Sequence, residues 1–408
     1  MSEFTIKRLG HQGDGIADGP DGDIYVPFSL PGEIVEGEVE GDRIASPRIV
    51  TSSSDRVKAP CPHFKSCGGC ALQHVSDTFL ADWKAQVVKT ALDAQGLTAE
   101  FDPIVVSSSH SRRRATLTGR RTKKAAMVGF HARASDALIA IPSCTLLHPD
   151  ILAKIPVLED LTKLGTSRKG EITFAVTQSS AGLDVDVHGA KETDGPLLAQ
   201  LGQFCGQNGL ARLSWNGEVV AARAAPVQRF GNFDVTPPPG AFLQATEEGQ
   251  TALINAVKNA VGTARKVADL FAGCGTFTLP LAETAEVAAY ESDAAALAAL
   301  DKSWRSSSGL KAVTTQTRDL FRRPLEPDEL NKFEAVVIDP PRAGAKAQCE
   351  TLAESTVQRI AFVSCNPVTF ARDAVTLDKA GFRLERVQVI DQFRWSPHVE
   401  LVASFSRD

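Results

Sequence analysis

Residues 266–282, KVADLFAGCGTFTLPLA, decide the fold. They have the pattern of a buried strand, a tight turn and the start of a helix. Gly273 and Gly275 allow the turn to bend sharply and its backbone to approach a ligand closely. Glu291 lies roughly 20 residues further on, where a carboxylate can accept hydrogen bonds from ribose hydroxyls. The stretch predicts a nucleotide-type cofactor on a Rossmann-like sheet, with a plain tight turn as the simpler alternative.

Two features of the same region indicate which cofactor binds. A dinucleotide-binding turn would carry a third glycine where Thr278 stands, so less room is left for a pyrophosphate. Asp339, in AVVIDPPRAG, is expected at the carboxyl end of another strand, the edge at which open α/β sheets bind ligands. We therefore favour S-adenosylmethionine over NAD.

The whole chain divides into three parts by sequence pattern. Residues 236–408 alternate between strand and helix patterns, which predicts an α/β domain with a mainly parallel, doubly wound sheet. Residues 1–55 have short strands separated by glycine turns, typical of a small five-stranded, OB-like β-barrel. Residues 56–235 are mostly strand-like after one helix near Asp77, so we expect a β-rich central domain.

The composition limits the class of protein. The chain has 408 residues, 43% of them hydrophobic and 23% charged, as in ordinary globular proteins. No apolar run is long enough to span a bilayer, and the first residues lack the apolar core of a signal peptide. We therefore expect a cytoplasmic protein without membrane contact, and nothing indicates an obligate protein partner. Its 8 cysteines are then metal ligands, catalytic thiols or small buried residues.

Charge is unevenly distributed along the chain. The net charge is −5, yet residues 112–124, RRRATLTGRRTKK, are strongly basic. A local basic stripe can bind phosphates whatever the total charge. A solvated hairpin is the alternative interpretation of this stretch. The acidic segment 1–55 is a poor candidate for binding RNA by itself.

Cys365 is a candidate nucleophile. In FVSCNP it follows an apolar run, so it is expected at a strand end beside Asp339. Addition of its thiolate to C6 of uracil would make C5 nucleophilic enough to accept a methyl group from a sulfonium. A general base must then remove the C5 proton, and Glu400 in the final predicted strand is the candidate. A small, inert buried thiol is the alternative for Cys365.

A second group of cysteines has the spacing of metal ligands. Cys61, Cys67 and Cys70 lie within CPHFKSCGGC, and Cys144 is the candidate fourth ligand. Spacing does not separate zinc from an iron–sulfur cluster, and His63 and His74 keep a zinc site open. Unrelated buried thiols are the remaining alternative.

The segments SCNPVTFARDAVTLDKAGF, DLFAGCGTFTLPLA, DPPRAGA and HVELVASFSR resemble the RNA uracil-C5 methyltransferases of the RumA/RlmD and TrmA type, and the likeness spans the chain. The resemblance implies an N-terminal TRAM domain and a [4Fe-4S] cluster on the four cysteines. It implies Cys365 as nucleophile and Glu400 as base. It also places at cofactor-binding positions Gln244, Phe271, Thr276, Glu291 and Asp339.

The resemblance also bears on the substrate. The barrel and the cysteines are more similar to the members that act on 23S ribosomal RNA than to those that act on tRNA. A tRNA enzyme, an RNA cytosine-C5 methyltransferase and an RNA-binding iron–sulfur protein without turnover are the alternatives. Thr246 stands where the family usually has Asn, and residues 394–396, RWS, replace its usual Pro-His-Thr, which leaves Trp395 as a candidate for stacking on a base.

Overall fold

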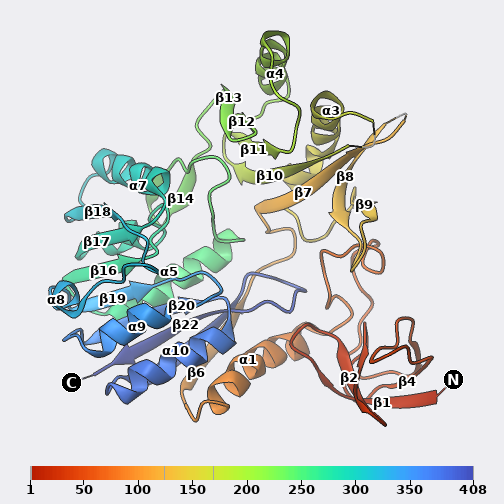
Figure 1. Cartoon of the computed structure of the whole chain (residues 1–408), viewed down its shortest axis with the longest axis horizontal. Helices are drawn as coiled ribbons and strands as arrows, with labels where there is room; N and C mark the ends of the chain where they lie inside the picture. The colour runs from red at the N-terminus through yellow and green to blue at the C-terminus, as the bar shows by residue number, and fades with distance from the viewer. Residues whose placement is uncertain (1, 124, 169, 408) are drawn as a thin grey trace.

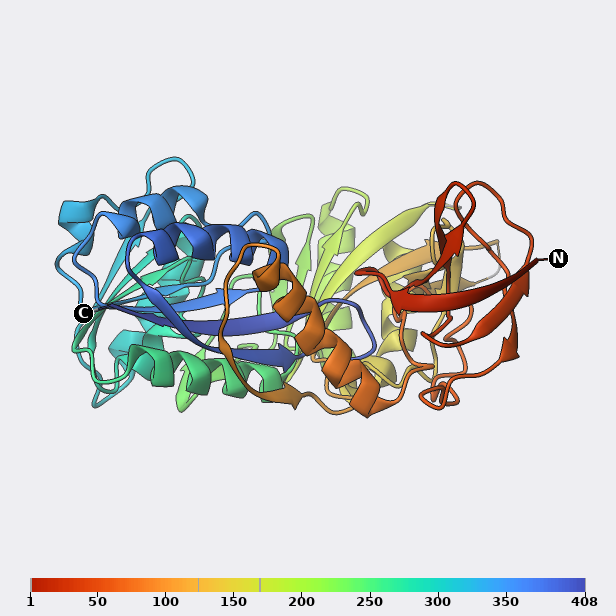
Figure 2. The same cartoon turned by 90° about the horizontal axis from the view of Figure 1, so that it is seen from below.

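The computed structural model describes residues 2–123, 125–168 and 170–407. The molecule is elongated, with the N-terminal strands at one end and the largest sheet at the other (Figure 1, Figure 2). Within the described ranges, no helix has the length and hydropathy needed to cross a bilayer. Lys124, the last residue of the predicted basic stripe, lies outside the described ranges.

The N-terminal segment is a five-stranded sheet in the order β3-β2-β1-β4-β5. Backbone hydrogen bonds between Tyr25 and both Asp42 and Ile44 join β3 to the connection after β4, so the sheet curls on itself. A small apolar core fills the curl, with Ile6, Val26 and Val35 almost fully buried. The strands are β1 (Ser2–Leu9), β2 (Gly15–Gly19), β3 (Gly22–Val26), β4 (Ile34–Gly37) and β5 (Arg48–Thr51).

The central segment is built on a seven-stranded sheet in the order β13-β12-β11-β10-β7-β8-β9. Alternate residues of β10 are buried, because one face of the sheet packs against helices. The strands are β7 (Arg114–Arg121), β8 (Ala126–His131), β9 (Leu138–Ala140), β10 (Glu171–Ser179), β11 (Gly182–His188), β12 (Arg212–Trp215) and β13 (Glu218–Ala222). The helices are α2 (Pro149–Ala153), α3 (Ile155–Gly165) and α4 (Gly195–Gln207). A hairpin of β14 (Gln228–Phe230) and β15 (Phe233–Val235) leads on to the third part.

The largest sheet has eight strands in the order β18-β17-β16-β19-β20-β22-β21-β6. Strands β18 to β20 are parallel, while β22 runs antiparallel to both of its neighbours, so the predicted mainly parallel α/β architecture is confirmed. The strands are β6 (Glu100–Val106), β16 (Lys266–Leu270), β17 (Glu286–Glu291), β18 (Val313–Thr317), β19 (Ala335–Ile338), β20 (Arg359–Ser364), β21 (Arg383–Asp391) and β22 (Glu400–Ser406).

Helices cover both faces of this sheet, which is why its central strands are continuous apolar runs. All four residues of β19 are buried. Figure 2 shows α5 on one side of the strands and α9 and α10 on the other. The helices are α1 (Asp77–Asp93), α5 (Glu247–Val261), α6 (Thr278–Leu281), α7 (Ala294–Ser306), α8 (Pro327–Leu330), α9 (Lys346–Ala353) and α10 (Pro367–Lys379).

One segment crosses the expected division of the chain. Strand β6 pairs in parallel with β21, and α1 packs on α10 and β21, although both precede residue 236. Lys84 of α1 forms a fully buried ion pair with Asp391 at the end of β21, with 2.5 Å between Nζ and Oδ1. Residues 88–106 therefore pack mainly with the third part of the chain, and β6 joins its sheet, although the sequence pattern placed them in the central domain. Leu80, near the start of α1, belongs to the core of the central sheet.

Candidate active site

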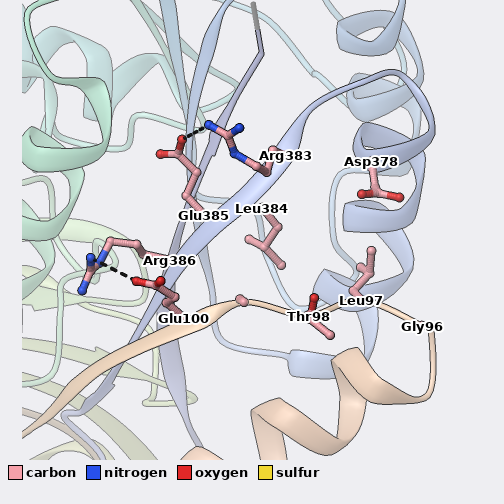
Figure 3. A pocket seen from close by; sticks show the side chains of 10 residues that line it. Gly96, Leu97, Thr98, Glu100, Asp378, Arg383, Leu384, Glu385 and Arg386 are labelled. Carbon is pink, nitrogen blue, oxygen red and sulfur yellow. Dashed lines mark hydrogen bonds and ion pairs between the residues drawn. The ribbon is translucent and has the colours of Figure 1, made fainter.

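Two large depressions differ sharply in character. An open groove of about 750 Å³ lies where β6 meets β21, and most of its charged side chains form ion pairs, as in Arg383–Glu385 and Arg386–Glu100 (Figure 3). A cavity of about 590 Å³ lies at the carboxyl ends of the parallel strands, where α/β sheets bind ligands. Only the second contains predicted site residues, so it is the candidate active site.

The cavity collects nearly every predicted catalytic and cofactor residue. Its wall includes Gln244, Phe271, Gly273, Thr276, Glu291, Asp339, Cys365 and Glu400. Gly275 is the exception. It turns the chain with a φ of 91°, and a Cβ there would lie 2.4 Å from Leu300 Cδ1, so this glycine allows close packing against α7.

The turn after β16 is shaped for close ligand approach. Phe271 and Gly273 both have left-handed backbones, with φ of 64° and 55°, a conformation that costs a non-glycine residue energy and is concentrated at functional sites. The backbone N–H of Gly273 donates to Glu291 Oε2 at 3.1 Å. This bond fixes the carboxylate at the end of β17 against the turn.

Acidic groups gather around the turn. Burial raises the pKa of Asp269 to about 7, although Thr278 Oγ1 donates to its Oδ2 at 2.5 Å. Its Oδ1 is buried without a hydrogen-bond partner. Burial, followed by repulsion from Asp269 and Glu291, also raises the pKa of Asp339. Carboxyl groups held close together in this way favour a cationic ligand, such as a sulfonium with its ammonium group.

Cys365 and Glu400 face the same cavity from adjacent strands. Cys365 follows β20, and Glu400 begins β22, which pairs with β20. Burial, with repulsion from Glu400 and Asp339, raises the pKa of the Cys365 thiol to about 11. Burial and Asp339 likewise raise the pKa of Glu400, which is only 4% exposed. Negative charge on Glu400 and Asp339 therefore disfavours the thiolate form of Cys365.

The sequence pattern missed several residues of the wall. Asp319, Phe393 and His398 line the cavity, and Gln392 contacts two of its residues from just outside the wall. Asp319 follows β18 and carries the same signal as Asp339, an acid after a strand. Phe393 and His398 lie in an irregular loop and have no local signature.

The departures from the family pattern have structural explanations. Thr246 is the N-cap of α5, where its Oγ1 accepts from the N–H of Gly249 at 2.9 Å, a role that threonine fills well. Trp395 is only 5% exposed and packs in the central core, so the suggested stacking of this ring on a base is wrong. Its carbonyl accepts the N–H groups of Ala71 and Leu72, which ties the loop after β21 to the residues that follow Cys70.

The four predicted cysteine ligands line one small cavity. Burial, and then repulsion from Cys144 and Cys61, raises the pKa of Cys67, so these sulfurs lie close together. His63 lines the same cavity, but its Nε2 contacts Ser143 Oγ at 3.0 Å. His74 is instead buried against Phe64, with its ring stacked at a centroid distance of 5.7 Å.

These cysteines do not form a single-ion site. In residues 2–123, 125–168 and 170–407, no three His, Cys, Asp or Glu side chains are gathered as ligands of one metal ion. A single zinc ion would draw four sulfurs to about 2.3 Å from itself. The four cysteines therefore line one small cavity without being gathered as a ligand set in the described part of the chain.

A parallel α/β sheet with an acidic, glycine-lined cavity at its carboxyl edge is typical of S-adenosylmethionine-dependent methyltransferases. The family model described as tRNA (Uracil-5-)-methyltransferase matches residues 238–407. An uncharacterized RNA methyltransferase of Brucella suis is 44% identical, over 99% of this chain and 98% of that protein. The 23S rRNA (uracil(1939)-C(5))-methyltransferase RlmD of Shewanella amazonensis is 31% identical, over 98% of this chain and 95% of that protein.

A solved structure shares the fold. The tRNA (uracil-54, C5)-methyltransferase of Pyrococcus abyssi, in complex with S-adenosyl-L-homocysteine, has a TM-score of 0.77 at 24% identity, over 99% of both chains. The chain belongs to the RNA uracil-C5 methyltransferase family, and its predicted assignment to that family, to S-adenosylmethionine and to RNA is confirmed.

Proposed function

We propose that this enzyme methylates C5 of a uridine in 23S ribosomal RNA through a covalent bond between Cys365 and C6. The observation that carries the proposal is the presence of Cys365, Glu400 and the glycine turn in the wall of one cavity. The ribosomal substrate is supported by the 31% identity to the Shewanella enzyme over nearly the whole chain. Methylation of tRNA is the competing outcome, because the similar solved fold belongs to a tRNA enzyme.

The proposed reaction forms two bonds to the uracil ring, one at C6 and one at C5, and removes one proton from C5. The sulfur of Cys365 bonds to C6, and the electron pair displaced from the C5–C6 double bond makes C5 a nucleophile. When bound, S-adenosylmethionine supplies the methyl group for C5. Glu400 then accepts the C5 proton, the double bond re-forms and the C6–sulfur bond breaks, so Cys365 leaves as a thiolate.

Cys365 has to lose its thiol proton before its sulfur can attack C6, and its raised pKa opposes that loss. Cys365 is mainly a thiol at neutral pH because it is buried beside two carboxyl groups. A positive charge at the cofactor position would offset those carboxyl groups and favour the thiolate. Ordering of cofactor before nucleophilic attack is therefore part of the proposal.

A further cavity, which adjoins the active-site cavity, offers a path for the RNA. It has a volume of about 360 Å³ and shares Phe393 and His398 with the active-site cavity. Arg112 of the basic stripe lines it and stacks over Phe393 at 6.0 Å, and no hydrogen bond or ion pair engages its guanidinium within the described part of the chain. An unpaired guanidinium beside an aromatic ring suits a phosphate with a neighbouring base, so we assign RNA next to the target uridine to this cavity. The target base itself must leave its stack to reach the buried thiol.

We further propose that residues 1–55 are a TRAM-like barrel and that residues 56–235 form the central domain, from which β6 extends into the sheet of the third part. The four cysteines would hold a [4Fe-4S] cluster, with zinc as the alternative. Cys67→Ala should abolish the visible absorption of anaerobically purified protein, whereas Cys205→Ala, a buried cysteine outside the cluster cavity, should retain it. A colourless wild-type protein that contains zinc would refute the cluster.

A covalent trap tests the reaction. With 5-fluorouridine-substituted 23S rRNA and S-adenosylmethionine, the C5 fluorine cannot be removed as a proton, so the enzyme should stay bonded to the RNA. Wild type should give a slowly migrating band on a denaturing gel, and Cys365→Ala should give none. Trapping on tRNA but not on 23S rRNA would change the substrate assignment, and trapping on neither would refute the reaction.

A further inference from the structure

Gln392 joins two of the groups that line the active site. Its Nε2 donates to Glu400 Oε2 at 3.1 Å and to Gln244 Oε1 at 2.6 Å. Its Oε1 accepts from the backbone N–H of Ala245 at 2.7 Å. A side-chain amide has two N–H donors, so both are in use, and the Ala245 contact determines which end of the amide is nitrogen.

The position of Gln392 is fixed from every side. The side chain is 2% exposed, and a Cβ on Gly249 of α5 would lie only 2.6 Å from Gln392 Cβ, so the helix approaches it closely. The preceding residue, Asp391, is anchored by the buried Lys84. Because the amide is held by fixed backbone, it can in turn hold the side chains to which it donates.

The bonds made by Gln392 decide which atoms remain free. Glu400 Oε2 accepts the hydrogen bond from Gln392, whereas Oε1 accepts none among the described residues and is the oxygen more available to a proton donor. Gln244 Oε1 is also occupied, which leaves its amide nitrogen as a donor for a ligand in the cavity that Gln244 lines. We propose that Gln392 is a positioning residue for the proton-transfer step, orienting Glu400 Oε1 toward the C5 proton and the Gln244 amide nitrogen toward the ligand in the cavity that Gln244 lines. The inference rests on the proposed function and specifies how its base is held.

The surrounding charges determine the sign of the pH effect. Asp339 follows β19, Cys365 follows β20 and His398 lies on the loop before Glu400, and Arg342 is a further charged residue of the wall. Burial and Asp339 raise the pKa of Glu400, whereas the hydrogen bond from Gln392 lowers it. Loss of this bond should raise the pKa further, so the carboxylate that acts as base would form only at higher pH.

The experiment compares Gln392→Met, just after β21, with Gln388→Met, within β21, whose amide donates to the carbonyl of Pro103. Release of tritium from in vitro transcribed 23S rRNA labelled at uridine C5 measures proton removal, and methyl incorporation is followed separately. Gln392→Met should slow tritium release by about 10-fold at pH 7 and move the acidic limb of its pH profile upward by about one to two pH units. Covalent RNA adduct should accumulate, while Gln388→Met should behave as wild type.

Several outcomes would overturn the inference. A tritium-release profile of Gln392→Met that coincides with that of Gln388→Met would exclude a role in proton transfer. If Gln392→Met does not fold, the near-isosteric Gln392→Glu keeps an oxygen for Ala245 and places another carboxyl group beside Glu400, so its acidic limb should also move upward. An unchanged or lowered limb in that variant contradicts the assignment. Wild type that neither releases tritium nor forms an adduct would refute the proposed function itself, a result distinct from a failure of Gln392 alone.

Discussion

At the scale of single residues, chemistry at strand ends was predictable. Cys365, Asp339 and Glu291 each follow an apolar run, and parallel strands bring such positions to one edge. Gln392 was not predictable, because its function depends on partners 148 and 8 residues away in the sequence. A buried glutamine has no recognisable sequence pattern, because only the fold determines which groups it forms hydrogen bonds with.

Glu400→Gln tests the base. The glutamine amide keeps the size of the side chain but does not accept the C5 proton, so the methylated adduct with Cys365 should persist. We expect RNA-linked protein to accumulate on a denaturing gel with natural, unfluorinated RNA, and turnover to fall by at least about 100-fold. Normal turnover by this variant would place the base elsewhere.

Asp269→Asn tests the buried acid below the glycine turn. The folded-state pKa of Asp269, about 7, is above the ordinary value of 3.8, so the folded protein binds more protons and this group makes folding less favourable as pH rises from about 4 to 7. The asparagine variant lacks this penalty. Its melting temperature relative to wild type should therefore increase between pH 5 and pH 8, measured without cofactor. A difference in melting temperature between the variant and wild type that is the same at pH 5 and pH 8 would contradict the raised pKa of Asp269.

At the scale of elements, local patterns located the strands but not all of their partners. Alternation of helix and strand predicted the parallel part of the large sheet. The addition of β6 was missed because residues 100–106 pair with a strand that lies far along the chain. Only the packed structure shows that α1 and β6 complete the catalytic sheet, since strand patterns carry no information on distant partners.

Lys84→Met tests how α1 is attached to that sheet. The substitution leaves Asp391 buried without its ion-pair partner, which should cost about 3–5 kcal/mol in the free energy of unfolding. Lys89→Met, an exposed lysine of the same helix, should change it by less than about 0.5 kcal/mol.

The double variant Lys84→Met/Asp391→Leu provides the decisive comparison for this pair. It removes both buried charges, so denaturant unfolding should show that much of the lost stability is recovered. A double variant as unstable as the sum of both single variants would mean that the two charges do not act as a pair.

At the scale of the whole molecule, the three parts meet around the active-site loop. The loop after β21 supplies Phe393 and His398 to the cavity, and the carbonyl of Trp395 bonds to the cysteine-bearing segment. Gln12 of the N-terminal segment lines the adjoining cavity together with Arg112. The acidic N-terminal part thus lies beside the proposed RNA path, to which Arg112 would supply positive charge.

Arg112→Ala tests that path. Because its guanidinium is unpaired within the described residues, its loss should weaken binding of 23S rRNA and reduce the slope of log affinity against log salt by about 1. Arg120→Ala is the control, since Arg120 is already paired with Glu171. Equal effects of the two substitutions would argue for diffuse attraction by the stripe as a whole.

The position of β22 has a consequence for how the enzyme matures on the ribosome. This strand lies between β20 and β21 but is synthesised after both. Until it emerges, two strand edges remain unsatisfied inside a nascent chain, a situation that invites wrong pairing and chaperone binding. Because β22 also begins with Glu400, the sheet closes only when the proposed base is in place, so a nascent chain that still lacks this strand is expected to be inactive.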